Sequence, residues 1–433
     1  MTVPASRPPQ ENEEEDEGPI YVNDADVLEE FDVDEEDLPD VYDGDGDGDG
    51  DGDGDGNGDG SDGDGDGGDG GHGGADGSGG NQDFDMDDGD AVFPEQDDSV
   101  HAFSGHKGPV YSVACSPTDK GLVATGGGDD VTFIWRVGDA ESHKQLQGHT
   151  DSIAALGFSH DGQLLASGGL DGIVNVWDSS TGALKQKLEG PGEAIEWVKW
   201  HPRGHLVLAG SEDVTAWLWN ADTAACMAVL SGHSGAVTCG DFTPDGKTIC
   251  TGSEDGSFRV WNPKTGESNR VVQGHPFHTE GLTCLAISND SSIAITGSTD
   301  HNACLVNIQT GKVHATLAEH SKSLECVGFS SGLQLAASGA MDGKLIVWDL
   351  QTLQSRLTCE HEDGVVKLLW SPASQLVFTG CLDGKVRAWD GRTGNCERVF
   401  EGHGDSILDL AISRDGNMII SGSDDNTARV FEM

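Results

Sequence analysis

Short apolar runs alternate with turns rich in Gly, Asn and Asp over most of the chain from residue 99 onward. The stretch 148–188 shows the pattern most clearly. It contains four apolar runs, at 153–158, 164–167, 174–177 and 184–188. None of these runs is long enough for a helix, and turn residues separate all of them. The pattern therefore predicts four short antiparallel strands.

This unit recurs about every 42 residues, opening with Gly-His and reaching Trp-Asp before its last strand. The tryptophan position holds, in order, Trp135, Trp177, Trp219, Trp261, Val306, Trp348, Trp389 and Phe431. The leading histidines are His106, His149, His233, His275, His320, His361 and His403, and one repeat lacks one. Such a period with these ends is typical of WD-repeat blades, which must pack radially to bury their faces. We therefore predict an all-β, eight-bladed WD-repeat β-propeller over residues 99–433.

The order of the strands predicts how the ring closes. The eighth unit ends at Arg429–Met433, before any outer strand, while 99–103 precedes the first unit and reads as a spare outer strand. Pairing the two would leave neither edge exposed. We expect the preceding segment to leave at the rim, on the face opposite the Gly-His loops.

Residues 1–98 differ sharply in composition from the rest. They carry 37 of the 77 acidic residues and only one of the 24 Lys and Arg residues, and 43–80 is an almost pure Asp-Gly tract. Such a segment cannot bury enough apolar area to offset its chain entropy, so we predict a disordered acidic tail. Its Asp-x-Asp strings resemble calcium loops only superficially, because the flanking helices and closing Glu are missing.

The composition also narrows the class of partner. The formal net charge of −53 repels nucleic acid, so we expect basic proteins as partners and no direct nucleic-acid or membrane binding. No run reaches the length of a signal peptide or a membrane span. The ten cysteines show no Cys-x-x-Cys spacing and are interpreted as small strand residues in a reducing compartment. We expect a monomeric cytoplasmic protein, with shuttling to the nucleus as the alternative.

Each complete unit repeats one polar set of His, Ser or Thr, Asp and Trp. The sets are His106, Thr125, Asp129 and Trp135; His149, Ser167, Asp171 and Trp177; His233, Thr251, Asp255 and Trp261; His320, Ser338, Asp342 and Trp348; and His361, Thr379, Asp383 and Trp389. A hydrolase needs such a set once, together with an oxyanion hole and a cleft. Repetition around the ring favours instead a network that locks each loop to its blade. We therefore predict no enzyme, catalytic residue, cofactor or metal site.

Three units depart from this pattern. The third has Gly192-Glu193 in place of the histidine and Ala209 in place of Ser or Thr, and keeps only Asp213 and Trp219. The fifth is interpreted as keeping His275, Thr296 and Asp300, with Val306 for Trp and an entry loop three residues longer. The eighth has Phe431. These departures indicate either drift or loops made available to a partner.

In WD-repeat propellers generally, two positions per blade line the central opening on the Gly-His face. The first set here is Tyr111, Ala154, Glu196, Thr238, Thr283, Glu325, Val366 and Leu408. The second set is Gly128, Leu170, Glu212, Glu254, Thr299, Met341, Leu382 and Asp424. Acids gather at blades three and four and apolar residues at blades seven, eight, one and two, with no Lys or Arg in either set. Solvated rim charge is one explanation. A site for a basic, amphipathic peptide is the other.

The stretch 189–204, EGPGEAIEWVKWHPRG, resembles the corresponding part of the angio-associated migratory cell protein family. Members of that family are WD-repeat chains with an acidic N-terminal segment, and the resemblance covers about residues 99–433. It implies an eight-bladed propeller. Fungal relatives chaperone one basic large-subunit ribosomal protein, whereas animal relatives are tied to cell migration and signalling. The Asp-Gly tract departs from the family, so no role transfers to it.

Two functions follow from these observations. The first is a dedicated chaperone that captures a basic ribosomal protein on the acidic and apolar rim. The partner-binding residues would be Tyr111, Leu170, Glu196, Glu212, Glu254, Glu325, Met341, Val366, Leu382, Leu408 and Asp424. The second is a scaffold in signalling, or a substrate receptor of a cullin-RING ubiquitin ligase, because 378–392 approximates a Trp-Asp-x-Arg box ending at Arg392. As a solvated turn residue, Arg392 would carry no such role.

Overall fold

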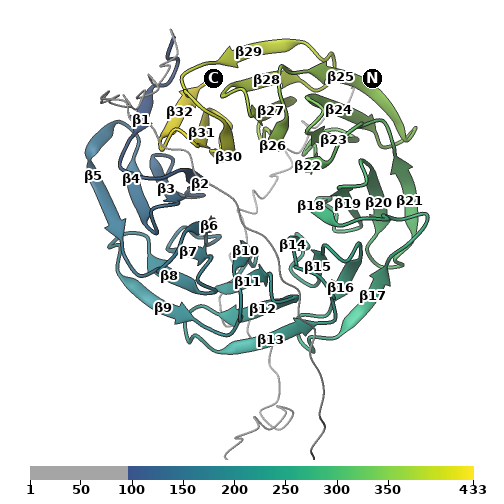
Figure 1. Cartoon of the computed structure of the whole chain (residues 1–433), viewed down its shortest axis with the longest axis horizontal. Coiled ribbons are helices and arrows are strands. Elements are labelled where there is room, and N and C mark those ends of the chain that lie inside the picture. Colours follow the sequence, from purple (N-terminus) through teal and green to yellow (C-terminus); the bar gives the residue numbers. More distant parts are fainter. Residues whose placement is uncertain (1–95) are drawn as a thin grey trace, which may run out of the picture. The chain divides into compact units, whose positions relative to one another are not determined.

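The computed structural model describes residues 96–433, where 32 strands form eight four-stranded antiparallel sheets arranged in a ring (Figure 1). These sheets are the predicted blades, so the eight-bladed all-β fold is confirmed. The predicted disorder of the acidic tail lies outside the described residues. Within 96–433 there is no helix that could cross a membrane.

Each blade runs from an innermost to an outermost strand. The innermost strands are β2 (Val110–Cys115), β6 (Ile153–Phe158), β10 (Ile195–Trp200), β14 (Cys239–Phe242), β18 (Leu282–Ile287), β22 (Leu324–Phe329), β26 (Val365–Trp370) and β30 (Ile407–Ile412). The second strands are β3 (Leu122–Gly127), β7 (Leu164–Gly169), β11 (Leu206–Ser211), β15 (Ile249–Gly252), β19 (Ile293–Ser298), β23 (Leu335–Ala340), β27 (Leu376–Cys381) and β31 (Met418–Ser423).

The third strands carry the Trp position near their ends. They are β4 (Thr132–Arg136), β8 (Val174–Asp178), β12 (Thr215–Asn220), β16 (Phe258–Trp261), β20 (Ala303–Asn307), β24 (Lys344–Asp349), β28 (Val386–Asp390) and β32 (Ala428–Glu432). The outermost strands are β5 (Asp139–Leu146), β9 (Leu184–Leu188), β13 (Cys226–Ser231), β17 (Ser268–Val272), β21 (Val313–Leu317), β25 (Gln354–Glu360), β29 (Cys396–Phe400) and β1 (His101–Phe103).

The core of the ring lies between the blades. Each of its eight apolar clusters draws on two neighbouring blades; one joins Leu164 and Val174 of blade two to Ile195 of blade three, all three fully buried. Second strands such as β7 are buried along their whole length, whereas outer strands such as β9 expose most residues. A single blade cannot bury both of its faces alone, so the blades stabilise one another around the ring.

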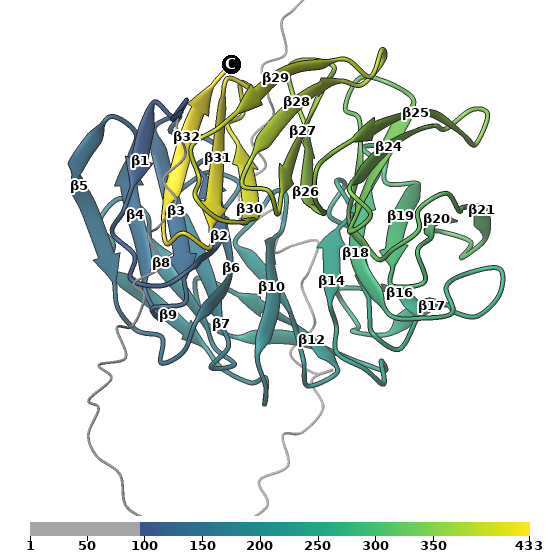
Figure 2. The same cartoon turned by 45° about the horizontal axis from the view of Figure 1, so that its top comes forward.

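The ring closes as predicted, with strands from both ends of the chain in one sheet. β1 pairs with β32 in antiparallel register, His101 opposite Val430 and Phe103 opposite Ala428, and the two lie side by side in Figure 2. Phe103 is 5% exposed and stacks on Trp135 of blade one at 5.0 Å between ring centroids. This strand therefore completes blade eight and also packs against blade one.

The predicted exit of the N-terminal segment is wrong. The Asp98 amide donates to the Glu401 carbonyl at 2.8 Å, and the Glu401 amide donates to the Asp98 carboxylate at 3.0 Å. Asp97 pairs with Arg429 beside Gly402, directly before the Gly-His histidine of blade eight. The segment therefore meets the ring on the Gly-His side, because Arg429 and the free amide of Glu401 hold the two carboxylates there.

Candidate functional site

A buried polar network holds the Gly-His loop of each complete blade. In blade two, His149 Nδ1 lies 3.1 Å from the Asp171 carboxylate, and His149 Nε2 lies 2.8 Å from Ser167 Oγ. Trp177 Nε1 donates to the same Ser167 oxygen at 2.8 Å. Every proton has one acceptor if Ser167 donates to a neutral His149, which in turn donates to Asp171. The network therefore matches the predicted scaffold.

Blades one, four and six repeat these contacts, at distances between 2.8 and 3.4 Å. Burial lowers the pKa of His106, His233 and His320, in keeping with neutral rings. The Ser167 side chain is 0% exposed, so its oxygen cannot reach a substrate. Gly169 is required beside the network, since a Cβ there would lie 2.5 Å from His149 Nδ1.

The predicted histidine of blade five is wrong. His278 Nδ1, rather than a His275 nitrogen, lies 3.1 Å from Asp300, and His278 Nε2 lies 2.8 Å from Thr296 Oγ1. The three extra loop residues leave His275 exposed and place His278 22 residues before the aspartate, as in blades two, four and six. Val306 in the Trp position supplies no indole donor to Thr296, whose hydroxyl lies 3.4 Å from the Cys304 carbonyl of β20.

The predicted network of blade seven is only partly right. His361 Nε2 lies 2.9 Å from Thr379 Oγ1, but its Nδ1 lies 3.2 Å from the Gly343 carbonyl instead of Asp383. Asp383 pairs with Arg387 at 2.6 Å, and both side chains are less than a tenth exposed. Burial and the Arg387 charge lower the pKa of His361 to about 4. Asp383 therefore pairs with the buried guanidinium of Arg387 and not with His361.

Blade three keeps its loop without a histidine. The Gly192 amide donates to the Asp213 carboxylate at 3.0 Å, and Trp219 Nε1 donates to the Glu189 carbonyl at 3.4 Å. Asp213 and Trp219 are the two members that the sequence predicted to remain. Each now contacts the main chain of the loop directly.

Blade eight lacks only the indole. His403 contacts Asp425 at 2.9 Å and Ser421 at 2.7 Å, while Phe431 packs against Phe400 at 5.2 Å between ring centroids. The loop is therefore fixed as in the complete blades, without a Trp donor.

A β-bulge aims the first rim position in seven blades. The innermost strands of all blades except four skip one residue in their pairing, and the skipped residue is the predicted rim residue. In blade three, for example, Ile195 and Trp197 pair with β11 while Glu196 does not. A bulge re-aims a side chain. The eight first-set residues are all exposed or half-buried.

The second rim position is tied to the first by the main chain in every blade. Its amide donates to the carbonyl two residues before the first-set residue, at 2.8–3.0 Å; Glu212 bonds to Ala194 and Leu382 to Gly364 in this way. This repeated bond places the two rim side chains of each blade side by side. The sequence-predicted pairs are therefore brought together on the Gly-His face.

The acids of blades three and four converge. Burial, a hydrogen bond that protonated Glu196 donates to Glu212, and the charges of Glu212 and Glu254 raise the pKa of Glu196 to about 7. Glu212 and Glu254 are exposed. The two other rim acids stand further round: burial raises the pKa of Glu325, which is half-buried, and Asp424 is exposed. Three carboxyl groups thus share one region, where a cation would relieve their mutual repulsion.

Apolar rim residues meet at blades six and seven. A Cβ on Gly364 would lie 2.9 Å from Met341 Sδ and 3.2 Å from Leu382 Cδ1, so the two side chains flank the same point. Val366 and Leu408 are half-buried in the next bulges, and Tyr111 and Leu170 are 41% and 42% exposed. The rim therefore gathers three acids at blades three and four and most of its apolar residues from blade six round to blade two, with Glu325 and Asp424 among them.

Sequence reasoning missed the charge pairs directly below the rim. Lys367, one residue after the first-set position, pairs with Asp409 of the next blade at 2.8 Å. Asp409 also accepts from the Val113 amide at 3.0 Å. Lys199 lies 3.7 Å from Asp241 in the same way, between blades three and four. Opposite charges at equivalent positions of neighbouring innermost strands are the signal that could have found these contacts.

The cysteines fit their predicted role as strand residues. All ten are free, and eight are buried or half-buried, while Cys226 and Cys396 are exposed. Burial raises the thiol pKa of Cys115 and Cys239 to about 12.

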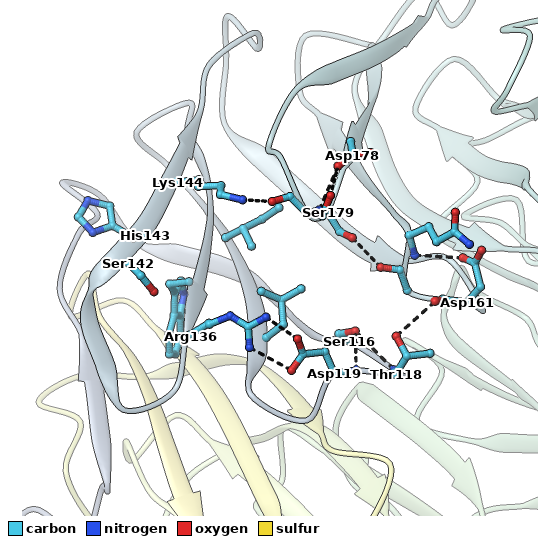
Figure 3. A pocket seen from close by; sticks show the side chains of 16 residues that line it. Ser116, Thr118, Asp119, Arg136, Ser142, His143, Lys144, Asp161, Asp178 and Ser179 are labelled. Carbon is cyan, nitrogen blue, oxygen red and sulfur yellow. Dashed lines mark hydrogen bonds and ion pairs between the residues drawn. The ribbon is translucent and has the colours of Figure 1, made fainter.

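Another cavity lies between blades one and two, on the side away from the Gly-His loops (Figure 3). It measures about 590 Å³, and its two cationic side chains are already engaged. Arg136 pairs with Asp119 at 2.5 Å, and Lys144 donates to the Ser180 carbonyl. The wall therefore pairs its own charges, whereas the rim acids lack cationic partners in their own sets.

Comparison with known proteins places the repeats in a family. The family described as WD domain, G-beta repeat matches eight segments, 97–136, 140–178, 182–220, 224–262, 266–307, 311–349, 352–390 and 394–432. The human angio-associated migratory cell protein is 39% identical over 358 residues, covering 77% of this chain and 80% of that protein. An uncharacterised WD repeat-containing protein of Schizosaccharomyces pombe is 36% identical over 346 residues, covering 78% and 87%.

Solved structures show the same ring. The crystal structure of Chaetomium thermophilum Sqt1 bound to the N-terminus of the ribosomal protein L10 superposes with a TM-score of 0.72 at 26% identity, covering 78% of this chain and all of that one. Saccharomyces cerevisiae Sqt1 gives a TM-score of 0.72 at 23% identity, which shows the fold alone.

Proposed function

Because the chain belongs to the angio-associated migratory cell protein family of WD-repeat proteins, we propose that it is a dedicated chaperone for a basic large-subunit ribosomal protein. Its Gly-His face binds a basic, amphipathic segment of that client for ribosome assembly. The propeller acts as a rigid binding platform in this role.

The observation that carries the proposal is the convergence of Glu196, Glu212 and Glu254 on the rim, where the pKa of Glu196 is raised to about 7. A carboxyl group with this pKa costs free energy to ionise beside Glu212 and Glu254, and a bound Lys or Arg removes that cost. Charged hydrogen bonds of this kind hold a partner in place and lower its dissociation rate. The acidic side of the rim thus selects a cationic segment.

The apolar side supplies an anchor. Met341 and Leu382 both pack over the buried Gly364, so their half-buried side chains form one apolar contact surface. An aliphatic side chain of the client would fit against these two residues, with Val366 and Leu408 beside it. Binding energy concentrates in such central apolar contacts, surrounded by polar ones.

The solved relative supports this choice of client. Chaetomium thermophilum Sqt1 binds the N-terminus of ribosomal protein L10, and its ring covers the same part of this chain. We propose a segment of the same chemistry here. The acidic residues of 1–98 would raise the rate of capture more than the final affinity, because charge is screened beyond about 8 Å at physiological salt.

No contact favours the cullin-receptor alternative. Arg392 is exposed, and its guanidinium donates to Gln375 Oε1 at 3.3 Å within the same blade. Its backbone amide donates to the Asp390 carboxylate at 2.7 Å, as expected of a turn residue.

Affinity capture from a salt-washed lysate tests the proposal. The full chain should recover one large-subunit ribosomal protein, and the variant Glu196→Lys/Glu325→Lys should lose it. Glu267→Lys/Glu397→Lys is the matched control, because both residues are exposed near outer strands and the charge change is the same. Recovery of no ribosomal protein, or equal recovery by both variants, would contradict the proposal.

A further inference from the structure

We propose that His160, Asp161 and His205 form a binding site for a first-row transition-metal ion, with Zn²⁺ as the preferred ion. The site lies on the side away from the Gly-His loops and joins blades two and three. His160 and Asp161 belong to the turn between β6 and β7, and His205 to the turn between β10 and β11. One donor atom from each residue lies within 4.8 Å of the other two.

The donor set suits zinc. Two imidazole nitrogens and one carboxylate oxygen are the ligands of many zinc sites that keep a fourth position for water. Donor atoms around a tetrahedral zinc ion lie about 3.3 Å apart, at bond lengths of about 2.1 Å. His205 Nε2 and Asp161 Oδ2 are 3.2 Å apart, so this pair already has the separation that the ion requires.

Two further contacts hold these ligands in place. Asp222 Oδ2 lies 3.0 Å from His205 Nδ1, which directs the other nitrogen toward Asp161. Carboxylates orient metal-binding histidines in this way. Asp161 Oδ1 accepts from Ser159 Oγ at 2.6 Å and from the Gln163 amide at 3.1 Å, which leaves Oδ2 for the ion.

His160 distinguishes a metal site from a plain ion pair. A hydrogen bond between His205 and Asp161 needs no third group, yet the His160 ring lies 5.9 Å from the His205 ring. Its Nδ1 is buried and has no hydrogen-bond partner among the described residues. A buried polar atom without a partner costs free energy, and a bound ion would give this imidazole a role.

The set occurs once in the ring. Aspartates equivalent to Asp161 recur and bind the hydroxyl two residues earlier, as Asp245 does with Thr243 at 2.6 Å. This part of the turn is therefore scaffold. The His160 position, in contrast, holds Pro, Asn, Ser or Arg in the other seven turns: Pro117, Pro202, Pro244, Asn289, Ser331, Pro372 and Arg414. A group repeated in every blade supports the fold, whereas a histidine pair at one junction points to a local ligand.

The site can be reached from solvent, and the blade-two and blade-three turns that form it are held together. His160 lines a cavity of about 270 Å³ with Trp200, and Asp161 lines the 590 Å³ cavity, where Figure 3 shows it. Trp200 Nε1 donates to the Gly157 carbonyl at 2.7 Å and so ties blade three to blade two. A bound ion would add a second link between blades two and three. Blade three is the blade whose Gly-His loop lacks a histidine.

Cobalt spectroscopy on the full-length protein tests the site. Four-coordinate Co²⁺ with nitrogen ligands absorbs strongly in the visible, whereas Co²⁺ bound by the carboxylates of 1–98 is six-coordinate and absorbs weakly. We expect the wild-type protein to show the strong band at one equivalent of Co²⁺ and to lose it when Zn²⁺ is added. His160→Ala and His205→Ala should both lack the band, and His275→Ala, at an exposed position, should keep it.

Circular dichroism on each variant separates loss of the ligand from loss of the fold. No band in the wild-type protein, or a band that survives in either of the two histidine variants, would overturn the proposal. The rim residues are untouched by these variants, so the outcome is independent of client binding.

Discussion

The Glu196 carboxyl group, in the bulge of β10, lies within hydrogen-bonding reach of Glu212, at the turn between β11 and β12 of the same blade. The backbone bond from Glu212 to Ala194, at 3.0 Å, fixes this approach. Two acids held together in this way cannot both ionise without cost.

Client binding should therefore depend on pH. Glu196 has a pKa of about 7 in the free protein, and a bound cation favours its ionised form, so affinity should rise as the pH increases through 7. If the bound carboxyl returns to an ordinary pKa, binding at pH 6 should be about tenfold weaker than at pH 8. Titration of a basic client peptide at several pH values measures this, and Glu196→Gln should flatten the profile.

Glu196 should also affect folding stability. A carboxyl whose folded pKa is raised binds its proton more tightly in the folded state, so its contribution to stability declines as the pH rises from about 4.5 to about 7. Thermal unfolding should show that Glu196→Gln stabilises the ring at pH 8 and has little effect at pH 4.5. The reverse order would contradict the assignment.

The corrected histidine of blade five gives a paired test. His278→Ala should lower the free energy of unfolding by about 2 kcal/mol, because Asp300 and Thr296 lose a buried partner. His275→Ala, three residues earlier and exposed, should leave it unchanged. Urea unfolding of both variants decides between the two histidines.

The buried pair of blade seven should be costly to break. Asp383→Ala leaves Arg387 buried without its partner and should destabilise the ring by about 3 kcal/mol. The double variant Asp383→Ala/Arg387→Leu should recover most of this loss, since neither charge then remains. If Asp383→Ala instead leaves the stability of the ring unchanged, the pairing is misassigned.

The closing strand should stabilise the whole ring. Phe103→Ala removes a buried side chain that stacks on Trp135 and should cost about 3 kcal/mol. Val100→Ala changes a side chain that is 52% exposed, and it serves as the control. Equal unfolding midpoints for the two variants would contradict the packing of β1 between blades eight and one.

The period and the turn residues were enough to predict the blades and the closure, because every blade packs in the same way. The rim positions came from what WD-repeat propellers generally show. What the period could not predict are contacts that break the repeat. The longer loop of blade five contains two histidines, and the sequence analysis chose His275 because it follows the glycine. The spacing of 22 residues between His278 and Asp300 could have identified the correct one. The pairing of Arg387 with Asp383 is a buried contact within blade seven, and no repeat spacing in the sequence predicts it.

The His160 and His205 pair was also out of reach. The two residues lie 45 positions apart, and only the packing of blade two on blade three brings their turns together. The convergence of Glu196, Glu212 and Glu254 was predicted from position, but the raised pKa follows from burial in the bulge, which sequence does not give.

Equilibrium binding of a labelled peptide from the N-terminus of ribosomal protein L10 tests the central claim most directly. Fluorescence anisotropy with the wild-type protein should give saturable binding at physiological salt. Glu196→Lys/Glu254→Lys should weaken it by about 30-fold or more, while the control Glu267→Lys/Glu397→Lys should bind as the wild type does. Absence of binding to the wild-type protein, or equal Kd values for the rim variant and the control, would contradict the account.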